Sequence, residues 1–285
     1  MKKSIEGSVA EIQKKFNIIG RDSELRKALT SKLAGKHLLL EGEVGVGKTV
    51  LAEAVARHFD QEFFRVDGDE RFNENKMVGV FDPPLVIENG YSWESFMPGP
   101  LTKAMKEGGI LFLNELNRLP EGTQNVLLPA MDEGRIGIPK LGVLHAEPGF
   151  YIIATQNPEE HVGVTTLGEA LKDRFVWIKL NYQSEDDECR ITELRSSSSN
   201  REVVRKAVKI VRLTRKHPDI RRGASVRAAI DIASIMNYYD DHDEEAWVEA
   251  ATSALAMKIE MEDSVERSLE VVIHDIVMQA LQDFP

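Results

Sequence analysis

A glycine-rich octet that ends in a lysine and a threonine has the residue types and spacing to bind phosphate groups. Residues 42–49 read Gly-Glu-Val-Gly-Val-Gly-Lys-Thr and match the pattern G-x-x-x-x-G-K-S/T. In such a loop, glycines let backbone N–H groups curl around phosphates, the lysine reaches the terminal phosphates and the threonine hydroxyl binds Mg²⁺. The octet therefore predicts binding of a nucleoside triphosphate. The predicted contacts are Glu43, Val44, Gly45, Val46, Gly47, Lys48, Thr49 and Val50, with Thr49 also a metal ligand.

This motif needs a strand before it and a helix after it, and the flanking residues predict both. Residues 37–40 form an apolar run typical of a buried strand. Residues 50–59 place Leu51, Val55 and Phe59 at helical spacing. A further helix is predicted over residues 22–33, which leads directly into the strand.

The rest of the chain alternates between strand-like and helical segments up to about residue 180. Further apolar runs that predict strands occur at 63–66, 110–113, 151–154 and 175–178. This alternation predicts an α/β fold with three αβα layers around a parallel sheet. Two insertions interrupt it: a loop-rich stretch at 82–100 with exposed aromatics, and a β-hairpin at 135–144. From Ser184 onward only helical patterns remain, so we expect a core domain at 1–180 and an all-helical domain at 181–285.

Two polar residues, Asn114 and Glu115, directly follow the predicted strand at 110–113. Parallel sheets place ligands at the carboxyl ends of their strands. In P-loop ATPases this is the Walker B position, where an aspartate orients the Mg²⁺ shell and the following glutamate polarises the attacking water. Asn114 can accept a hydrogen bond from a metal-bound water but brings no negative charge. We therefore expect Asn114 to hold Mg²⁺ weakly and turnover to be slow.

Taken together, the motifs resemble those of the MoxR branch of the AAA+ ATPases, over nearly the whole chain. Asn-Ile-Ile-Gly-Arg at 17–21 and Met-Pro-Gly-Pro-Leu at 97–101 are similar to family segments before the Walker B strand. The resemblance continues through 114–120, 123–131 and Ala-Thr-Gln-Asn-Pro at 154–158. Leu-Lys-Asp-Arg-Phe at 171–175 and Gly-Ala-Ser-Val-Arg at 223–227 complete the set in the family's order.

The resemblance implies a P-loop AAA+ core with a C-terminal helical lid, ATP and Mg²⁺ as ligands, and ATP hydrolysis with Glu115 activating water. It assigns Ile19 and Gly20 to packing on adenine, Asn157 to sensor 1 and Arg227 to sensor 2. Arg174 falls at the position of the arginine finger, whose guanidinium reaches a neighbouring subunit's γ-phosphate. A homo-oligomeric, hexameric ring is therefore expected. The family further implies chaperone-like remodelling of a client, or of a partner with a von Willebrand factor A domain.

Composition restricts the partners and the compartment. The net charge is −11, which disfavours a general nucleic-acid or anionic-membrane surface. Cys189 is the single cysteine, so no disulfide framework exists, and we expect it to be an inert side chain. The first sixteen residues do not resemble a signal peptide, and no apolar run reaches membrane-spanning length. We therefore expect a cytoplasmic protein.

Several alternatives stay open. The protein could be a nucleotide-gated scaffold with little hydrolysis because of Asn114, or a DNA-remodelling AAA+ ATPase, although its acidic charge disfavours the latter. Asn157 could only turn the chain before Pro158, and Arg174 and Arg227 could be solvated surface cations. The insertion aromatics could contact a partner or pack on one another; they are Phe81, Tyr91, Trp93 and Phe96.

Overall fold

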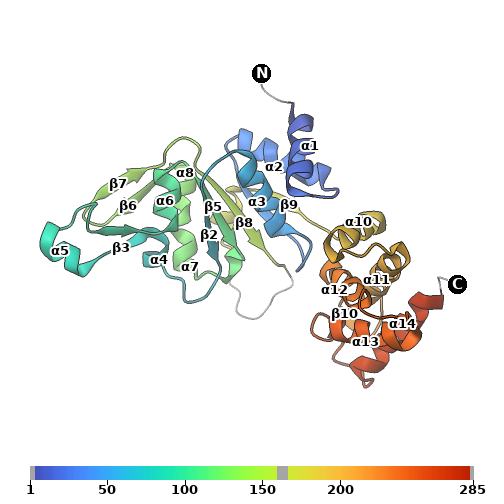
Figure 1. The fold of residues 1–285 in the computed structure, drawn as a ribbon. Coiled ribbons are helices and arrows are strands. Elements are labelled where there is room, and N and C mark those ends of the chain that lie inside the picture. Colours follow the sequence, from blue (N-terminus) through green and yellow to red (C-terminus); the bar gives the residue numbers. More distant parts are fainter. Residues whose placement is uncertain (1–3, 159–165, 283–285) are drawn as a thin grey trace. The chain divides into compact units, whose positions relative to one another are not determined.

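The computed structural model describes residues 4–158 and 166–282 (Figure 1). The chain forms two compact units. One comprises Met1–Glu43 with Gly47–Asn181, and the other comprises Val44–Val46 with Tyr182–Pro285.

A parallel five-stranded sheet forms the centre of the first unit, as the sequence predicts. Its order is β2-β5-β8-β1-β9. The strands are β1 (His37–Glu41), β2 (Phe63–Asp67), β5 (Ile110–Asn114), β8 (Tyr151–Gln156) and β9 (Phe175–Lys179). Because all five run in the same direction, their carboxyl ends meet at one edge, where Asp67 pairs with Asn114 and Glu41 with Gln156.

Helices cover both faces of this sheet (Figure 1). On one face, α2 (Asp22–Leu33) contacts β1 and β9, while α3 (Lys48–His58) contacts β2, β5 and β8. On the other face, Leu39, Leu111 and Ile152 pack in one core cluster with Leu101 and Met105 of α6 (Pro100–Lys106). Alternate residues of each strand point to opposite faces, so burial on both sides requires almost continuous apolar runs. Further helical segments of this unit are α1 (Ile5–Phe16), η1 (Leu116–Arg118), α7 (Glu121–Asn125), α8 (Leu127–Asp132) and α9 (Glu169–Lys172).

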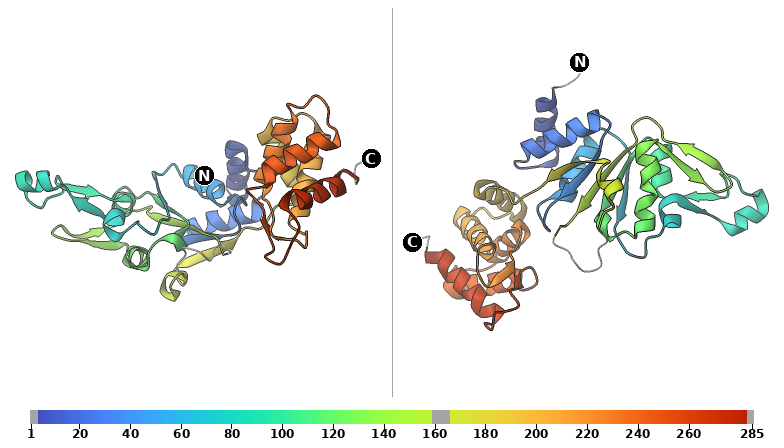
Figure 2. Two further views of the ribbon diagram at one scale, coloured as in Figure 1. Left: turned by 90° about the horizontal axis from the view of Figure 1, so that it is seen from below. Right: turned by 180° about the vertical axis from the view of Figure 1, so that it is seen from behind.

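The two insertions extend side by side from the first unit (Figure 2). The predicted hairpin is confirmed as β6 (Arg135–Ile138) paired with β7 (Gly142–His145). The other insertion is more ordered than its expected loop-rich character. It holds an antiparallel ribbon of β3 (Gly79–Phe81) and β4 (Phe96–Pro98) around α5 (Pro83–Asn89), and follows α4 (Glu74–Val78).

Aromatic packing explains part of this order. Phe81 lies between Tyr91 and Phe96, with ring centroids 5.0 Å and 5.1 Å away, and Trp93 meets Phe96 at 5.7 Å. Phe96 is buried, contrary to its expected exposure, whereas Tyr91 and Trp93 remain exposed. These four rings therefore pack on one another within the insertion, while Tyr91 and Trp93 also remain exposed to solvent.

The second unit is built mainly of helices around one apolar core that includes Trp247. Its helices are α10 (Glu185–Ser196), α11 (Arg201–Thr214), α12 (Val226–Met236), α13 (Glu244–Leu255) and α14 (Leu269–Gln282). The expectation of helices alone is wrong in one detail. A small antiparallel ribbon joins β10 (Ile220–Arg222) to β11 (Glu260–Met261), because residues about 40 positions apart pair across the fold, a long-range contact that local periodicity does not reveal.

A buried ion group links α10 to α11 in this unit. The Glu188 carboxylate accepts a hydrogen bond from Arg212 Nη1 at 2.8 Å and forms an ion pair with Arg215 Nη1, also at 2.8 Å. Arg215 also stacks on Tyr182, with its guanidinium carbon 3.8 Å from the ring centroid. The two guanidinium groups compensate the buried charge of Glu188, which would otherwise be costly.

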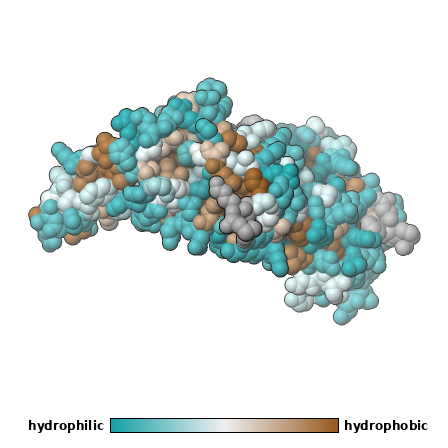
Figure 3. All heavy atoms as spheres, turned by 90° about the horizontal axis from the view of Figure 1, so that it is seen from above, coloured by the Kyte–Doolittle hydropathy of each residue, from teal (hydrophilic) through white to brown (hydrophobic). Residues whose placement is uncertain are grey.

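On the face drawn in Figure 3, hydrophobic residues form small patches separated by hydrophilic ones. In the part of the chain that the structure describes, no helix has both the length and the apolar character needed to cross a membrane.

His37, the first residue of β1, is a buried neutral imidazole. Its Nδ1 accepts a hydrogen bond from the Ile152 N–H at 3.0 Å, and the ring also has a backbone hydrogen bond with Met131. Burial lowers the pKa of His37 to about 4. Protonation at Nδ1 would remove the acceptor of the Ile152 N–H, so the charged form is disfavoured in the folded protein.

We predict that His37 makes folding stability fall as the pH drops from about 6.5 towards 4. The unfolded chain takes up a proton near pH 6.5 while the folded chain does not, so the stability is present above this window and lost within it. Compared with His37→Asn, the unfolding free energy of the wild type should decrease by about 2 kcal/mol more between pH 7.5 and pH 5. Urea unfolding at several pH values measures this difference. If the unfolding free energies of the wild type and His37→Asn differed by the same amount at every pH, His37 would not be the source of the pH dependence.

Candidate nucleotide-binding site

The glycine-rich loop runs from the end of β1 to the start of α3. Gly45 and Gly47 have φ angles of +83° and +96°, a backbone region that other residues rarely adopt. The Lys48 side chain folds back over the loop, where its Nζ donates hydrogen bonds to the carbonyl oxygens of Gly42 at 2.6 Å and Glu43 at 2.8 Å. The loop therefore has the strand, the turn and the helix start that phosphate binding requires.

A chain of hydrogen bonds connects α3 with the ends of three strands. Asn114 is at its centre. The Oδ1 atom of Asn114 accepts from the hydroxyls of Thr49 at 3.4 Å and Thr155 at 3.1 Å, and its Nδ2 donates to Asp67 Oδ1 at 3.0 Å. Asp67 in turn accepts from Arg65 Nη2 at 2.7 Å, which holds the pKa of the Asp67 carboxyl below its usual value.

These oxygen atoms fit a hard divalent cation. A hydroxyl, an amide oxygen and a carboxylate lie close together at the carboxyl edge of the sheet, and Mg²⁺ prefers oxygen ligands while retaining several waters. In the parts of the chain that the structure describes, histidine, cysteine and acidic side chains form no group of three that could hold a metal ion. The donor set at Thr49 and Asn114 is thus suited to a metal that is also held by phosphate oxygens.

Glu115 leaves the strand in an unusual backbone conformation. Its φ and ψ are 57° and 54°, in the left-handed region, and its N–H donates to Thr155 Oγ1 at 2.9 Å. This turn redirects the chain at the end of β5, before η1. The Glu115 carboxylate lies 3.5 Å from the Arg118 guanidinium and keeps about a third of its side-chain surface, 33%, exposed. Glu115 is therefore accessible to water next to Asn114.

Gly68, which directly follows the neighbouring strand β2, supports this turn. Its N–H donates to the Asn114 carbonyl at 2.7 Å. A Cβ atom at this position would lie 2.1 Å from the Glu115 carbonyl oxygen and 3.0 Å from its carbonyl carbon. The close approach of the two backbones therefore requires glycine.

Gly68→Ala should lower the free energy of unfolding by about 2 kcal/mol, because the backbone at Glu115 must move to admit the methyl group. Urea unfolding measures the change. Gly137→Ala is the matched control, since a Cβ there meets no atom within 4 Å. Equal stabilities of the two variants would show that the contact at Glu115 is not restrictive.

Asn157 lies next to the same edge, directly after β8. It is buried, with 4% of its surface exposed, and its carbonyl oxygen accepts from Asn117 Nδ2 at 3.4 Å. Because β8 pairs with β5, this position follows the strand next to the one that carries Asn114 and Glu115. The fold thus places Asn157, the expected sensor residue, at the same carboxyl end of the strands as Asn114 and Glu115.

Arg174 lies at the amino-terminal end of the strands, opposite to the end that carries the phosphate loop. Phe175, the first residue of β9, pairs with His37, the first residue of β1, so Arg174 precedes the amino ends of both strands. Its guanidinium makes two contacts with the Asp132 carboxylate, at 2.6 Å and 2.5 Å. Hydrogen bonding to Asp132 raises the pKa of Arg174, so its guanidinium is positively charged at physiological pH. Arg174 is therefore remote from the phosphate loop of its own chain.

The remaining predicted residues belong to other segments. Ile19 and Gly20 lie between α1 and α2, where the Gly20 carbonyl accepts from Gln13 Nε2 at 2.7 Å. Arg227 is in the first turn of α12, in the second compact unit.

Two residues of this site escaped the sequence interpretation. Asp67 and Thr155 contact Asn114 directly, yet neither was singled out. Both come at or near the carboxyl end of an apolar strand, as Asn114 does, and this shared position is the signal that could have identified them.

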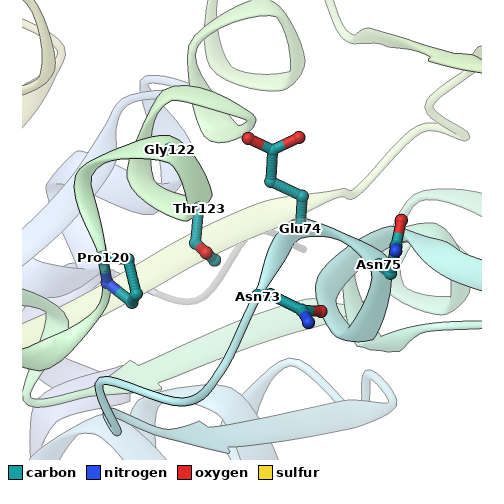
Figure 4. Close-up of a pocket in the computed structure, with 6 residues that line it drawn as sticks. All are labelled: Asn73, Glu74, Asn75, Pro120, Gly122 and Thr123. Carbon is teal, nitrogen blue, oxygen red and sulfur yellow. The ribbon is translucent and has the colours of Figure 1, made fainter.

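A separate hollow of about 330 Å³ lies between the starts of α4 and α7 (Figure 4). The Thr123 hydroxyl donates to the Phe72 carbonyl at 2.9 Å, and Gly122 approaches Glu74 so closely that a Cβ would meet Oε1 at 2.9 Å. These contacts hold α4 against α7. The hollow is lined by none of the residues predicted to bind nucleotide.

Comparison with known proteins identifies relatives of this chain. A model of the AAA domain, dynein-related subfamily, matches residues 37–175. An uncharacterized protein of Staphylococcus saprophyticus, SSP1341, is 31% identical over 226 residues, which cover 77% of this chain and 85% of that protein. The gas vesicle ATPase GvpN of Haloferax mediterranei is 28% identical over 259 residues, covering 83% and 74%.

Solved structures share the fold. A candidate ATPase from Cytophaga hutchinsonii aligns with a TM-score of 0.54 at 22% identity, over 96% of this chain and 94% of that one. A point mutant of Thermotoga maritima RuvB aligns with a TM-score of 0.52 at 18% identity, over 93% and 71%.

Proposed function

Because this chain belongs to the AAA+ ATPase family, we propose that it binds ATP with Mg²⁺ and hydrolyses it to remodel or activate a partner protein. One observation supports this most directly. The Lys48 amine and the Thr49 hydroxyl lie at the start of α3, and the Asn114 amide and the Glu115 carboxylate lie at the end of β5, all at the carboxyl ends of the parallel strands.

Each group then has a defined task. The loop N–H groups and Lys48 bind the phosphates, while the Thr49 hydroxyl and the Asn114 amide oxygen hold the metal. Mg²⁺, when bound, neutralises charge that develops on the phosphate oxygens. Glu115 accepts a proton from the attacking water, for which its exposed carboxylate is suited, and Asn157 orients that water.

Hydrolysis in this proposal needs a second subunit. Arg174 precedes the amino ends of the strands, whereas the phosphate loop follows the carboxyl end of β1, so it cannot complete its own site. We propose that a ring, in hexameric form, brings Arg174 to the neighbouring subunit's γ-phosphate, where a fixed cation stabilises charge. Arg174 must then exchange Asp132 for phosphate. We assign Arg227 to the nucleotide within its own subunit, and Ile19 with Gly20 to adenine.

The domain roles and the client follow the MoxR resemblance. We propose residues 1–180 as the nucleotide-binding core and residues 181–285 as the helical lid. The relative GvpN, a gas vesicle ATPase, supports a chaperone-like role in which ATP cycles act on another protein. A partner with a von Willebrand factor A domain is the class that we propose first.

Glu115→Gln should reduce the steady-state rate of ATP hydrolysis by about 100-fold or more, because it removes the proton acceptor. ATP affinity should stay within about twofold, because the amide keeps the shape of the side chain. A phosphate-release assay and equilibrium ATP binding measure the two effects. Glu121→Gln, an exposed carboxylate on the next helix, is the charge-matched control.

An unchanged rate in Glu115→Gln would reject the enzymatic role. If the wild type binds ATP but does not hydrolyse it, the uncharged amide of Asn114 at the proposed metal site would favour the alternative of a nucleotide-gated scaffold.

A further inference from the structure

Asp67 lies beside Asn114, whose amide brings no negative charge to the proposed Mg²⁺ site. It is the last residue of β2 and pairs in register with Asn114, the last residue of β5. Its Oδ1 lies 3.0 Å from Asn114 Nδ2. The two strands therefore end in an aspartate and an asparagine in direct contact.

The hydrogen bonds fix the direction of the Asn114 amide. A carboxylate such as that of Asp67 only accepts hydrogen bonds, so the group that faces it must be the NH₂. The amide oxygen then faces the hydroxyls of Thr49 and Thr155. Asp67 thus holds the metal-binding oxygen of Asn114 towards Thr49.

Arg65 hydrogen-bonds to both carboxylate oxygens of Asp67, but its single positive charge balances only one of the two carboxylates beside it. Arg65 also lies 3.5 Å from Glu53 of α3, so this group of two carboxylates and one guanidinium carries one net negative charge. The Asp67 side chain is 60% exposed. Its Oδ2 accepts a hydrogen bond from Arg65 Nε at 3.0 Å and, as a carboxylate oxygen, can accept a further one from water. Mg²⁺ in nucleotide sites keeps several of its waters, and a nearby carboxylate can accept hydrogen bonds from them.

We propose that Asp67 supplies, from the neighbouring strand, the negative charge that Asn114 lacks at the Mg²⁺ site. This inference rests on the proposed function. Asp67 is a positioning residue, because it acts through the Asn114 amide and through metal-bound water. The carboxylate of one strand end and the amide of the next together replace a single aspartate.

The test measures how Mg²⁺ tightens nucleotide binding, without any turnover. The full chain is titrated with the non-hydrolysable ATP analogue AMP-PNP, first in EDTA and then at increasing MgCl₂. The variants are Asp67→Asn, Asn114→Asp and the double variant that carries both changes. Glu70→Gln is the control, since it removes the same charge from an exposed side chain three residues away.

Asp67→Asn should raise the Mg²⁺ concentration for half-maximal tightening about tenfold, because a nearby charge is lost, while affinity in EDTA stays the same. The double variant, which moves the carboxylate to position 114, should return to within about twofold of the wild type. Rescue of this kind would not occur if Asp67 only stabilised the strand end. Glu70→Gln should behave as the wild type.

Equal Mg²⁺ dependence of Asp67→Asn and Glu70→Gln would overturn the inference, and so would a double variant no better than Asp67→Asn. Neither result would affect the proposed function. A wild type that binds no AMP-PNP, with or without Mg²⁺, would instead reject the proposed function itself.

Discussion

The parallel pairing of β1, β8, β5 and β2 is the constraint on which the candidate site depends. It brings the carboxyl ends of four strands to one edge, so the phosphate loop, Asn157, the Asn114–Glu115 pair and Asp67 become neighbours although they are far apart in sequence. The same alignment places Arg174 at the other edge. Parallel strands thus separate the groups that act on the subunit's own nucleotide from the one proposed to act on a neighbour's.

Hydrogen bonds fix the positions of the side chains at the carboxyl ends of these strands. Asn114 is held on both sides, by hydroxyl donors at its oxygen and by the Asp67 carboxylate at its nitrogen. Gly68 allows the backbone of β2 to approach Glu115, whose left-handed conformation turns the chain away from the strand. A polar network of this kind is costly when only part of it is satisfied, so its members constrain one another's positions.

Much of the first unit could be predicted from sequence because its signals are local. Apolar runs such as residues 110–113, the glycine-rich octet and the hairpin at 135–144 depend on neighbouring residues, and the α/β fold with its parallel sheet is confirmed. The strand-end position of Asp67 could have been noticed, but its hydrogen bond to Asn114 and the pairing of Arg174 with Asp132 could not be predicted, because no local pattern specifies which side chains meet over more than 40 positions. The β10–β11 ribbon was missed for the same reason. The roles of Asn157, Arg174 and Arg227 stay predictions, since they concern a nucleotide and a neighbouring subunit.

The central claim is that the loop from Gly42 to Thr49 binds ATP through Lys48. Isothermal titration of ATP with Mg²⁺ into the wild type and into Lys48→Ala tests it most directly. We predict saturable binding by the wild type and at least a tenfold weaker affinity for the variant, about 1.4 kcal/mol, because the cation that contacts the phosphates is lost. Equal affinities, or no binding by a folded wild type, would contradict the account.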